Sequence, residues 1–432
     1  MAFSKALMSA AVGVVLAAAA HGQSLDETLA LAELSNPSLD VSETDARIAR
    51  EALEEARAQG RVNVSVSGQA GFESLETNQP FAFQVGERAT AAASLEAALP
   101  IYTGGRVSAG VRAAEAGIDA ADARLEAQRQ AIYLQAISAF LNVTAGRATV
   151  DIRENNVRLL EEQVEAAQAR FRVGFITRTD VALSEARLAG ARAGLAFAEA
   201  ELERFEADFE AVTDVRPGAL GPVPPAPVLP LDFDEALAIL QEGNPQLIAL
   251  REDAQAASEV VEVEASAGRP TLDLVGTASG QQDFEDDLYN AGVSAFARGR
   301  VPLFQGGLVN SRVRTAKLRR EQARLQVQAA ERDLRASLAT AWFGVIAAER
   351  SIESSELQID AAEIAFEGAK RELSVGTRTT LDVLDSEQDL LDARLTLVQA
   401  ERDLQLAAYQ VLQAIGGLRR DVVLPSAPSP QP

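Results

Sequence analysis

Four short segments of the chain alternate apolar and polar residues with period two. In the first of them, Val62, Val64 and Val66 alternate with Asn63 and Ser65. Because successive side chains of a strand point to opposite faces of a sheet, such alternation predicts strands with one apolar face each. The predicted strands cover about residues 61–72, 88–99, 270–280 and 290–302.

Long helical patterns fill most of the remaining chain. One runs from residue 25 to 58 with a break at Asn36-Pro37, and another runs without a break from 104 to 171. At 1.5 Å per residue the second predicts a helix roughly 100 Å long, which exceeds the width of a compact globular domain. A shorter pattern follows to about residue 212, and the same succession returns after residue 231 and ends near 415.

The segments that leave the second and the fourth predicted strand share one pattern. Leu99–Arg106 is LPIYTGGR, and Val301–Leu308, 202 residues later, is VPLFQGGL. Proline cannot donate to a strand ladder, and paired glycines let the chain turn into the following helix. We therefore expect the proline to stop each ladder, with the strand–helix joins made by Pro100, Gly104, Gly105, Pro302, Gly306 and Gly307.

A second duplicated pattern separates the long helix of each half from the shorter helix after it. Residues 171–183 are FRVGFITRTDVAL, and residues 373–385 are LSVGTRTTLDVLD. A glycine in the left-handed conformation ends a helix, and Thr-x-x-Asp offers a hydroxyl and an acid to the free N–H groups that open the next one. We expect tight helix–turn–helix tips at about 171–180 and 373–382.

Two repeats and three flanking or linking segments account for the chain. Residues 1–22 carry Lys5, an apolar run and then small residues, which is typical of a secretory signal peptide. The first repeat is expected at 23–215 and the second at 231–417, joined by the proline-rich linker 216–230. Residues 418–432 are rich in Pro and Ser, and we expect them to be disordered.

Composition removes most catalytic chemistry. The chain has no Cys, and its single His, His21, lies at the expected cleavage site. Thiol nucleophiles, imidazole bases and zinc sites therefore have no support, and we expect neither a cofactor nor a metal. A formal net charge of −23 also argues against nucleic acid, because proteins that bind it present basic patches.

The alternating strands allow two interpretations. A small soluble sheet would pack its apolar face on a helix, whereas a sheet of the outer membrane would turn that face to lipid. Lipid does not tolerate open sheet edges, so four strands need further copies of the chain to close a barrel, and three copies give twelve strands. The signal peptide, the duplication and the lack of an apolar helix of about 18 residues favour the membrane. Tyr102 and Phe304 suit its interface with water.

Two uncharged stretches, 130–146 and 336–348, have a composition close to that of a membrane span. The first contains Gln130, Gln135 and Asn142, which a span would have to bury in lipid. A buried seam between helices accounts for them better.

The duplicated joins and tips resemble those of the TolC family of outer-membrane efflux proteins, over roughly residues 24–417. The resemblance implies a fold that is mainly α with a membrane β-barrel, in which each protomer repeats helix, strand, strand, long helix and helix twice. It implies a homotrimer in the outer membrane of a Gram-negative cell, with a twelve-stranded barrel in lipid and a helical barrel in the periplasm. It also implies two partners, a periplasmic adaptor (membrane fusion) protein and an inner-membrane pump of the RND, ABC or MFS type, for the export of small molecules or proteins.

The resemblance also assigns roles at the tips. Arg378 matches an arginine that holds the periplasmic mouth shut through partners matching Thr179 and Asp180, and Leu373 replaces a bracing tyrosine. Two acids match residues that ring the constriction. The gate residues assigned in this way are Thr179, Asp180, Leu373, Arg378, Asp382 and Asp385, and the positions that meet the adaptor are Val173, Gly174, Phe175, Val375, Gly376 and Thr377.

Three other interpretations stay open. Asp180 and Asp382 suit the starts of helices even where no gate exists. A structural periplasmic coiled coil that tethers layers of the envelope would also need long helices, although it would not need the same tip twice. An enzyme has little support, because the acids lie in helical repeats and not in a pocket-forming pattern.

Overall fold

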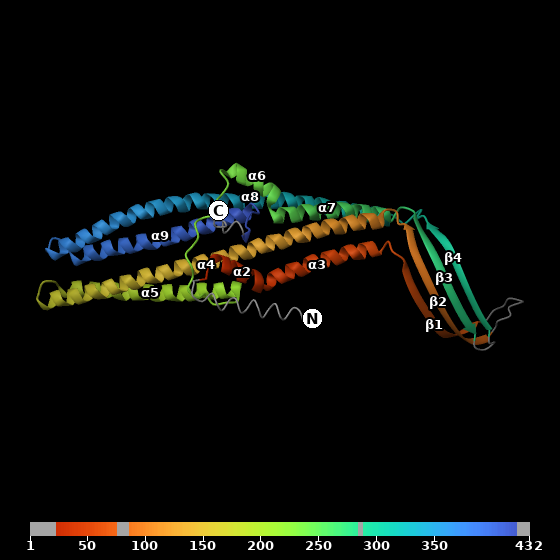
Figure 1. The fold of residues 1–432 in the computed structure, drawn as a ribbon, viewed down its shortest axis with the longest axis horizontal. Coiled ribbons are helices and arrows are strands. Elements are labelled where there is room, and N and C mark those ends of the chain that lie inside the picture. Colours follow the sequence, from red (N-terminus) through yellow and green to blue (C-terminus); the bar gives the residue numbers. More distant parts are fainter. Residues whose placement is uncertain (1–22, 76–85, 284–287, 421–432) are drawn as a thin grey trace, which may run out of the picture. The chain divides into compact units, whose positions relative to one another are not determined.

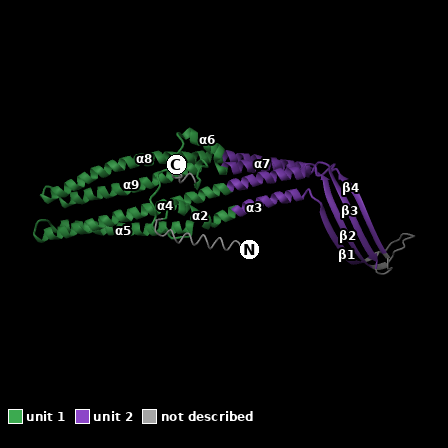
Figure 2. Cartoon of the chain, in the orientation of Figure 1, with its two compact units in different colours: residues 1–42, 125–246, 330–432 green, residues 43–124, 247–329 purple. Residues whose placement is uncertain are grey.

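A computed structural model describes residues 23–75, 86–283 and 288–420. The predicted signal peptide and all but the first residues of the predicted tail lie outside this part of the chain. The chain divides into two compact units, residues 1–42, 125–246 and 330–432 in the first and residues 43–124 and 247–329 in the second (Figure 2). Each unit takes segments from both sequence repeats.

The order of elements repeats once along the chain (Figure 1). Two helices, two strands, a long helix and a shorter helix are followed by the same six elements, which confirms the predicted duplication and the predicted fold class. The first half contains α2 (Leu25–Ser35), α3 (Pro37–Ala58), β1 (Asn63–Leu75), β2 (Gly86–Tyr102), α4 (Arg106–Arg172) and α5 (Arg178–Thr213). The second half contains α6 (Phe233–Gly243), α7 (Pro245–Ser266), β3 (Thr271–Asp283), β4 (Leu288–Arg300), α8 (Leu308–Ser374) and α9 (Thr380–Ala414).

The four strands form one antiparallel sheet in the order β1-β2-β3-β4. Its register keeps most of the apolar residues of the four strands on one face, although Val275 and Phe296 pair with each other on the opposite face. One cross-strand row of that face is Val66, Leu95, Ala278 and Val293. The neighbouring row, on the opposite face, is Ser67, Ser94, Ser279 and Gly292. The structure therefore confirms that the alternation seen in the sequence divides the sheet into an apolar and a polar face.

The prediction that Pro100 stops the ladder is wrong. β2 continues through Pro100, which pairs with Asp273, and ends at Tyr102 after an irregularity in the register. The pairing of β2 with β1 ends earlier, at Ala98. Beyond Ala98, the β1 side of β2 is unpaired within the described residues, so no strand there needs a backbone N–H from β2. Pro100 lacks that N–H and is therefore tolerated.

The strand–helix joins use backbone conformations that favour glycine. Gly104 has φ +64°, and a Cβ atom added to it would lie only 2.9 Å from the Cβ of Arg269. The same arginine donates from Nη1 to the Gly104 carbonyl at 3.1 Å, which holds the start of α4 beside the end of α7. The other three join glycines also have positive φ, namely Gly105, Gly306 and Gly307.

The main core of the first unit lies where α4, α8 and α9 meet α2, α5 and α6. Phe140 and Ile137 of α4 and Tyr409 of α9 are among its fully buried side chains. The stretch 130–146 is thus a buried seam between helices, as predicted, and Leu338 of its counterpart lies in the same core. Within the described residues, the helices include none that is both apolar and long enough to cross a membrane.

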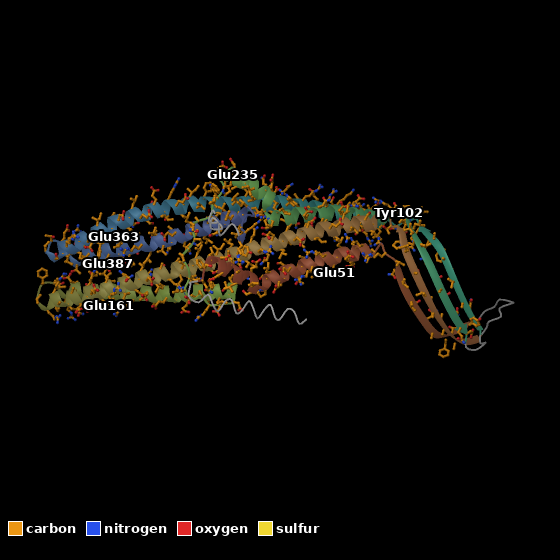
Figure 3. The ribbon with its side chains drawn as sticks, viewed as in Figure 1. Glu51, Tyr102, Glu161, Glu235, Glu363 and Glu387 are labelled. Carbon is orange, nitrogen blue, oxygen red and sulfur yellow. The ribbon has the colours of Figure 1, made fainter. Side chains whose placement is uncertain are left out.

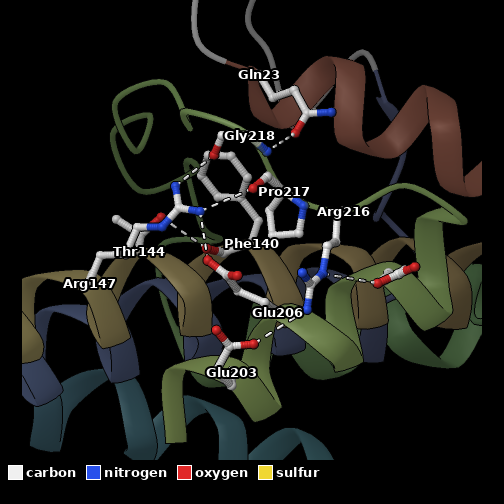
Figure 4. Close-up of polar contacts among 10 residues, drawn as sticks. Gln23, Phe140, Thr144, Arg147, Glu203, Glu206, Arg216, Pro217 and Gly218 are labelled. Atoms are coloured by element: carbon white, nitrogen blue, oxygen red, sulfur yellow. Dashed lines mark hydrogen bonds and ion pairs between the residues drawn. The ribbon is translucent and has the colours of Figure 1, made fainter. Parts of the chain in front are cut away.

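Arg147 on α4 holds the proline-rich linker in place (Figure 4). Its guanidinium donates to the carbonyls of Gly218 at 2.7 Å and Pro217 at 3.2 Å, and to the Glu206 carboxylate of α5 at 2.8 Å. The N–H of Gly218 donates in turn to the Gln23 side chain at 3.3 Å. Because charge-assisted bonds are among the stronger hydrogen bonds, one half-buried arginine links the linker to two helices.

Candidate functional site

The two tips are built in the same way. α4 ends where Gly174 takes φ +77°, and α8 ends where Gly376 takes φ +82°. In the first tip the Gly174 N–H donates to the Phe171 carbonyl at 2.9 Å, and the Phe175 N–H donates to the Arg170 carbonyl at 2.9 Å. The second tip has the same pair of bonds, which satisfy carbonyls that a helix end would otherwise leave free.

Each helix that leaves a tip begins with a capping box. The Thr177 hydroxyl accepts from the Asp180 N–H at 3.3 Å, and the Asp180 carboxylate accepts from the Thr177 N–H at 2.8 Å. Thr379 and Asp382 repeat this arrangement at the start of α9. Hydrogen bonds from the backbone and the side chain of Thr379 hold the pKa of the Asp382 carboxyl below its usual value.

The turns themselves present apolar side chains to solvent. Val173, Phe175 and Val375 are 80%, 64% and 74% exposed. Large apolar side chains at an exposed turn do not contribute to a core, and such a cluster is typical of a surface that meets a partner. Thr377 is tied to its own helix end, since its hydroxyl donates to the Glu372 carbonyl at 3.1 Å. Contact of these positions with an adaptor stays a prediction.

Arg378 binds acids of its own hairpin, which is the end of α8, the second tip and the start of α9. Its Nε donates to the Glu372 carboxylate at 2.9 Å, and its Nη1 lies 3.8 Å from the Asp382 carboxylate. Asp180 and Thr179 lie in the first hairpin, where the bonds of Asp180 are to Thr177. The single chain does not bring Arg378 to Asp180, so this pairing stays a prediction, and the sequence analysis missed Glu372 altogether.

Apolar side chains join the first hairpin to the second. Leu384 of α9 is buried against Leu160 of α4 and Leu188 of α5. Leu373 is half-buried and packs beside Phe366 and Val383 within the second hairpin. Leu373, which the resemblance matches to a bracing tyrosine, therefore lies in an apolar cluster, and its part in a gate stays a prediction.

An ion pair crosses between the hairpins at the same level. Arg187 of α5 donates to the Asp385 carboxylate of α9 at 2.8 Å, and both side chains are about half exposed. An exposed pair of this kind is worth about 0–1 kcal/mol. Asp385 was predicted as a constriction residue from its sequence position, but its partner was not.

Glu387 of α9, labelled in Figure 3, also binds the first hairpin, and its side chain is buried. Its carboxylate accepts from the Asn156 amide at 3.1 Å and from the Gln163 amide at 2.7 Å, both on α4. Burial raises the pKa of Glu387 to about 7, although the Gln163 bond and the positive charge of Lys370 oppose this shift. Sequence analysis missed this residue, and its signal was a glutamate in line with apolar core positions of α9.

Metal binding does not add to this picture. In the part of the chain that the structure describes, no three His, Asp or Glu side chains are grouped closely enough to hold a metal ion. The chemistry at the tips consists of carboxylates, arginines, amides and exposed apolar side chains. Groups of these kinds form weak polar bonds, such as the exposed ion pair that links the two hairpins.

Comparison with known proteins identifies the family. A family model described as outer membrane efflux protein matches residues 28–212 and 236–417, one match in each repeat. The outer membrane efflux protein BepC of Brucella suis is 31% identical over 423 residues, which cover 96% of this chain and 91% of BepC. The outer membrane protein TolC of Vibrio cholerae is 26% identical over 306 residues, covering 68% of this chain and 70% of TolC.

A solved structure shares the fold. The outer membrane protein VceC of Vibrio cholerae superposes with a TM-score of 0.80 at 21% identity, covering 91% of this chain and 96% of VceC. The family match extends over both repeats and includes both tips. The chain belongs to the outer membrane efflux protein family.

Proposed function

We propose that three copies of the chain form an exit duct that exports small molecules or proteins and is gated at the helical tips. The family is one of outer-membrane proteins, so the chain is located in the outer membrane. The observation that carries the proposal is the four-stranded sheet. One of its faces is apolar in every strand, and its outer strands β1 and β4 each pair on one side only within the described residues.

Three copies of the chain would pair the free edges of β1 and β4. Unpaired backbone groups are strongly disfavoured in lipid, so a four-stranded sheet needs neighbours on both sides. Pairing β4 of one copy with β1 of the next closes twelve strands, with the apolar face outward and the polar face around the lumen. Tyr102 and Phe304 are exposed beside the strand ends, where aromatic residues suit the membrane interface.

Exposed apolar residues of α8 support assembly outside the barrel as well. Leu357 and Ile364 lie seven residues apart and are both largely exposed in the single chain, and Leu318 and Leu325 repeat this spacing. Apolar residues seven apart keep to one side of a helix and form a seam with a neighbouring helix. We infer that this stripe packs against the next protomer.

The gate and the docking surface lie at the tips in this proposal. Arg378 and Asp180 of neighbouring hairpins restrict the mouth, and the acids Asp382 and Asp385 ring it. Val173, Phe175 and Val375 are exposed and free to meet a periplasmic adaptor. An inner-membrane pump supplies the energy, because the duct itself only conducts.

Conductance of the purified protein in planar bilayers tests the proposal. We expect trimers that resist SDS and discrete, cation-favouring current steps. Replacing Arg378 with Gln or Asp180 with Asn should raise the conductance, whereas Asp389→Asn, an exposed change on α9 beyond the tip, should not. Unchanged currents in both gate variants would remove these residues from the gate, and a water-soluble protein without steps would favour the tether.

A further inference from the structure

Glu387 stands out because its carboxyl group is buried and forms no ion pair with any residue in the part of the chain that the structure describes. The residue is only 4% exposed, and it forms a buried polar link between α9 and α4. Asn156 and Gln163 are seven residues apart on α4 and each binds a different carboxylate oxygen. One acid held between two neutral amides therefore adds a buried polar link to the apolar contacts and the ion pair that join the two hairpins.

The charged groups around Glu387 do not neutralise it. α8 contributes Lys370, whose field acts on Glu387 at a distance. α5 contributes Arg187, which is engaged with Asp385 on α9. α4 contributes the amides of Asn156 and Gln163, and Leu384, which is buried one turn before the acid, makes the seam apolar there. A carboxylate in such surroundings loses its hydration without gaining an opposite charge, so the neutral acid is favoured.

We propose that Glu387 is a proton-sensitive latch, which keeps α9 docked on α4 when it is protonated and favours their separation when it is ionised. The latch rests on the proposed function, since separation of α9 from α4 at this level frees the second tip to move. Acid therefore holds the mouth closed, and neutral to alkaline pH releases it.

The sign follows from proton linkage. In the docked state the carboxyl keeps its proton up to a pH of about 7, because burial raises its pKa, whereas an exposed glutamate loses it near the ordinary value of 4.5. Between these two values the docked state binds more protons, so its advantage falls as pH rises. The fall is at most about tenfold per pH unit for each protomer, and no further change occurs above the docked pKa.

Single-channel recording as a function of pH is the first test. For each protomer the ratio of released to docked α9 should rise about tenfold between pH 6 and pH 8, so the open probability of the unmodified trimer should rise by at least this factor where it starts low. Glu387→Gln mimics the protonated acid and should keep a low open probability throughout, while Asp389→Asn removes an acid from the exposed side of α9 and should keep the rise. A pH response that persists unchanged in Glu387→Gln would overturn the latch.

A second variant distinguishes the latch from a purely structural role of the Glu387–Gln163 contact, because only the latch predicts a shift in the midpoint of the pH response. The Gln163 bond lowers the pKa of Glu387, so Gln163→Leu should move the midpoint of the pH response upward. If Gln163→Leu changes the open probability at every pH without moving the midpoint, the residue acts only in packing and the proposal fails.

A cross-linking test does not depend on conduction. The chain has no Cys, so Leu160→Cys with Leu384→Cys provides a single thiol pair across the seam. In outer membranes, oxidation should link this pair less at pH 8 than at pH 6, relative to the same pair carrying Glu387→Gln. Equal ratios at both pH values would exclude the latch even if the duct conducts, and a changing ratio without current steps would instead contradict the proposed export function.

Discussion

Three acids within two turns of α9 have different properties because their neighbours differ. Asp382 caps the helix and accepts bonds from Thr379, which favour its ionised form. Asp385 is half-exposed and paired with Arg187. Glu387 is buried, and burial favours its protonated form although the bond from Gln163 opposes this. At the scale of single residues, the surroundings of each acid therefore decide its role: Asp382 caps a helix, Asp385 forms an ion pair, and Glu387 binds a proton.

The cap of α9 makes a prediction about the pKa of Asp382. Thr379→Val removes the hydroxyl that donates to the carboxylate and also loosens the backbone bond beside it. Both bonds favour the ionised form, so the pKa of Asp382 should rise toward its usual value, and the cap should then be lost at a higher pH as the solution is acidified. Titration of the labelled carboxyl carbon by NMR measures this. Thr396→Val, whose hydroxyl donates only to the Asp392 carbonyl, is the matched control and should leave the pKa unchanged.

Glycine at the turn makes a second prediction. Gly376 has φ +82° and nothing within 4 Å of an added Cβ, so Gly376→Ala adds backbone strain without a steric clash. We expect the second tip to lose about 1 kcal/mol of local stability. Gly368 lies within α8 with similar open space, and Gly368→Ala should gain about 0.5–1 kcal/mol. Hydrogen exchange of peptides covering both positions measures the two changes, and a neutral Gly376→Ala would show that the turn does not need the left-handed conformation.

At the scale of elements, periodicity was enough to predict the helices, the strands and their repetition, whereas the β-barrel and the helical barrel came from the family resemblance. Period two predicted the four strands and their apolar face, and duplicated turns predicted the tips, because these features depend on residues close in the sequence. The polar links between hairpins depend on packing of distant segments. Arg187 and Asp385 lie 198 residues apart, and Asn156 and Glu387 lie 231 apart. No local pattern pairs them, and Pro100 shows that even a strand end depends on where its neighbour stops.

The two faces of the sheet make a third prediction. Val293 lies near the middle of β4 on the apolar face, and Ser294 follows it on the polar face. If the apolar face meets lipid, Val293→Lys should destabilise the folded barrel by about 2–4 kcal/mol. Ser294→Lys carries the same charge one residue away and should change the stability much less. The fraction of heat-modifiable trimer in outer membranes measures both, and equal losses would indicate that neither face is in lipid.

At the scale of the whole molecule, the mouth of the proposed duct is formed by three chains together. Within one chain, Arg378 is occupied by Glu372 and lies farther from Asp382, while Arg187 already compensates Asp385. Three-fold repetition multiplies whatever charge is left uncompensated. The ion preference of the proposed duct should therefore depend on these pairings and not on the number of acids in the sequence. The sequence alone could predict a ring of acids, but not how much uncompensated charge each acid contributes.

The ion pairs of Asp382 and Asp385 predict which of these two acids has the larger effect on the ion preference of the proposed duct. The Asp385 carboxylate lies 2.8 Å from Arg187, whereas the Asp382 carboxylate lies 3.8 Å from an arginine that Glu372 shares. Asp382 should contribute more uncompensated negative charge to the constriction, because a close opposite charge cancels much of the field at a distance. Asp382→Asn should lower the preference for K⁺ over Cl⁻ more than Asp385→Asn does. Reversal potentials across a KCl gradient measure this preference.

Arg187→Gln removes the cation of the Arg187–Asp385 pair and leaves its acid in place. It leaves Asp385 without its cation, so the preference for K⁺ should increase, and Asp385→Asn should then have a larger effect than it has with Arg187 in place. Because both side chains are about half exposed, the differences should shrink at high salt, where charges are screened within a few ångströms. If Asp385→Asn proves the more damaging change and Arg187→Gln has no effect, the ion pair seen in one chain does not persist in the assembled mouth.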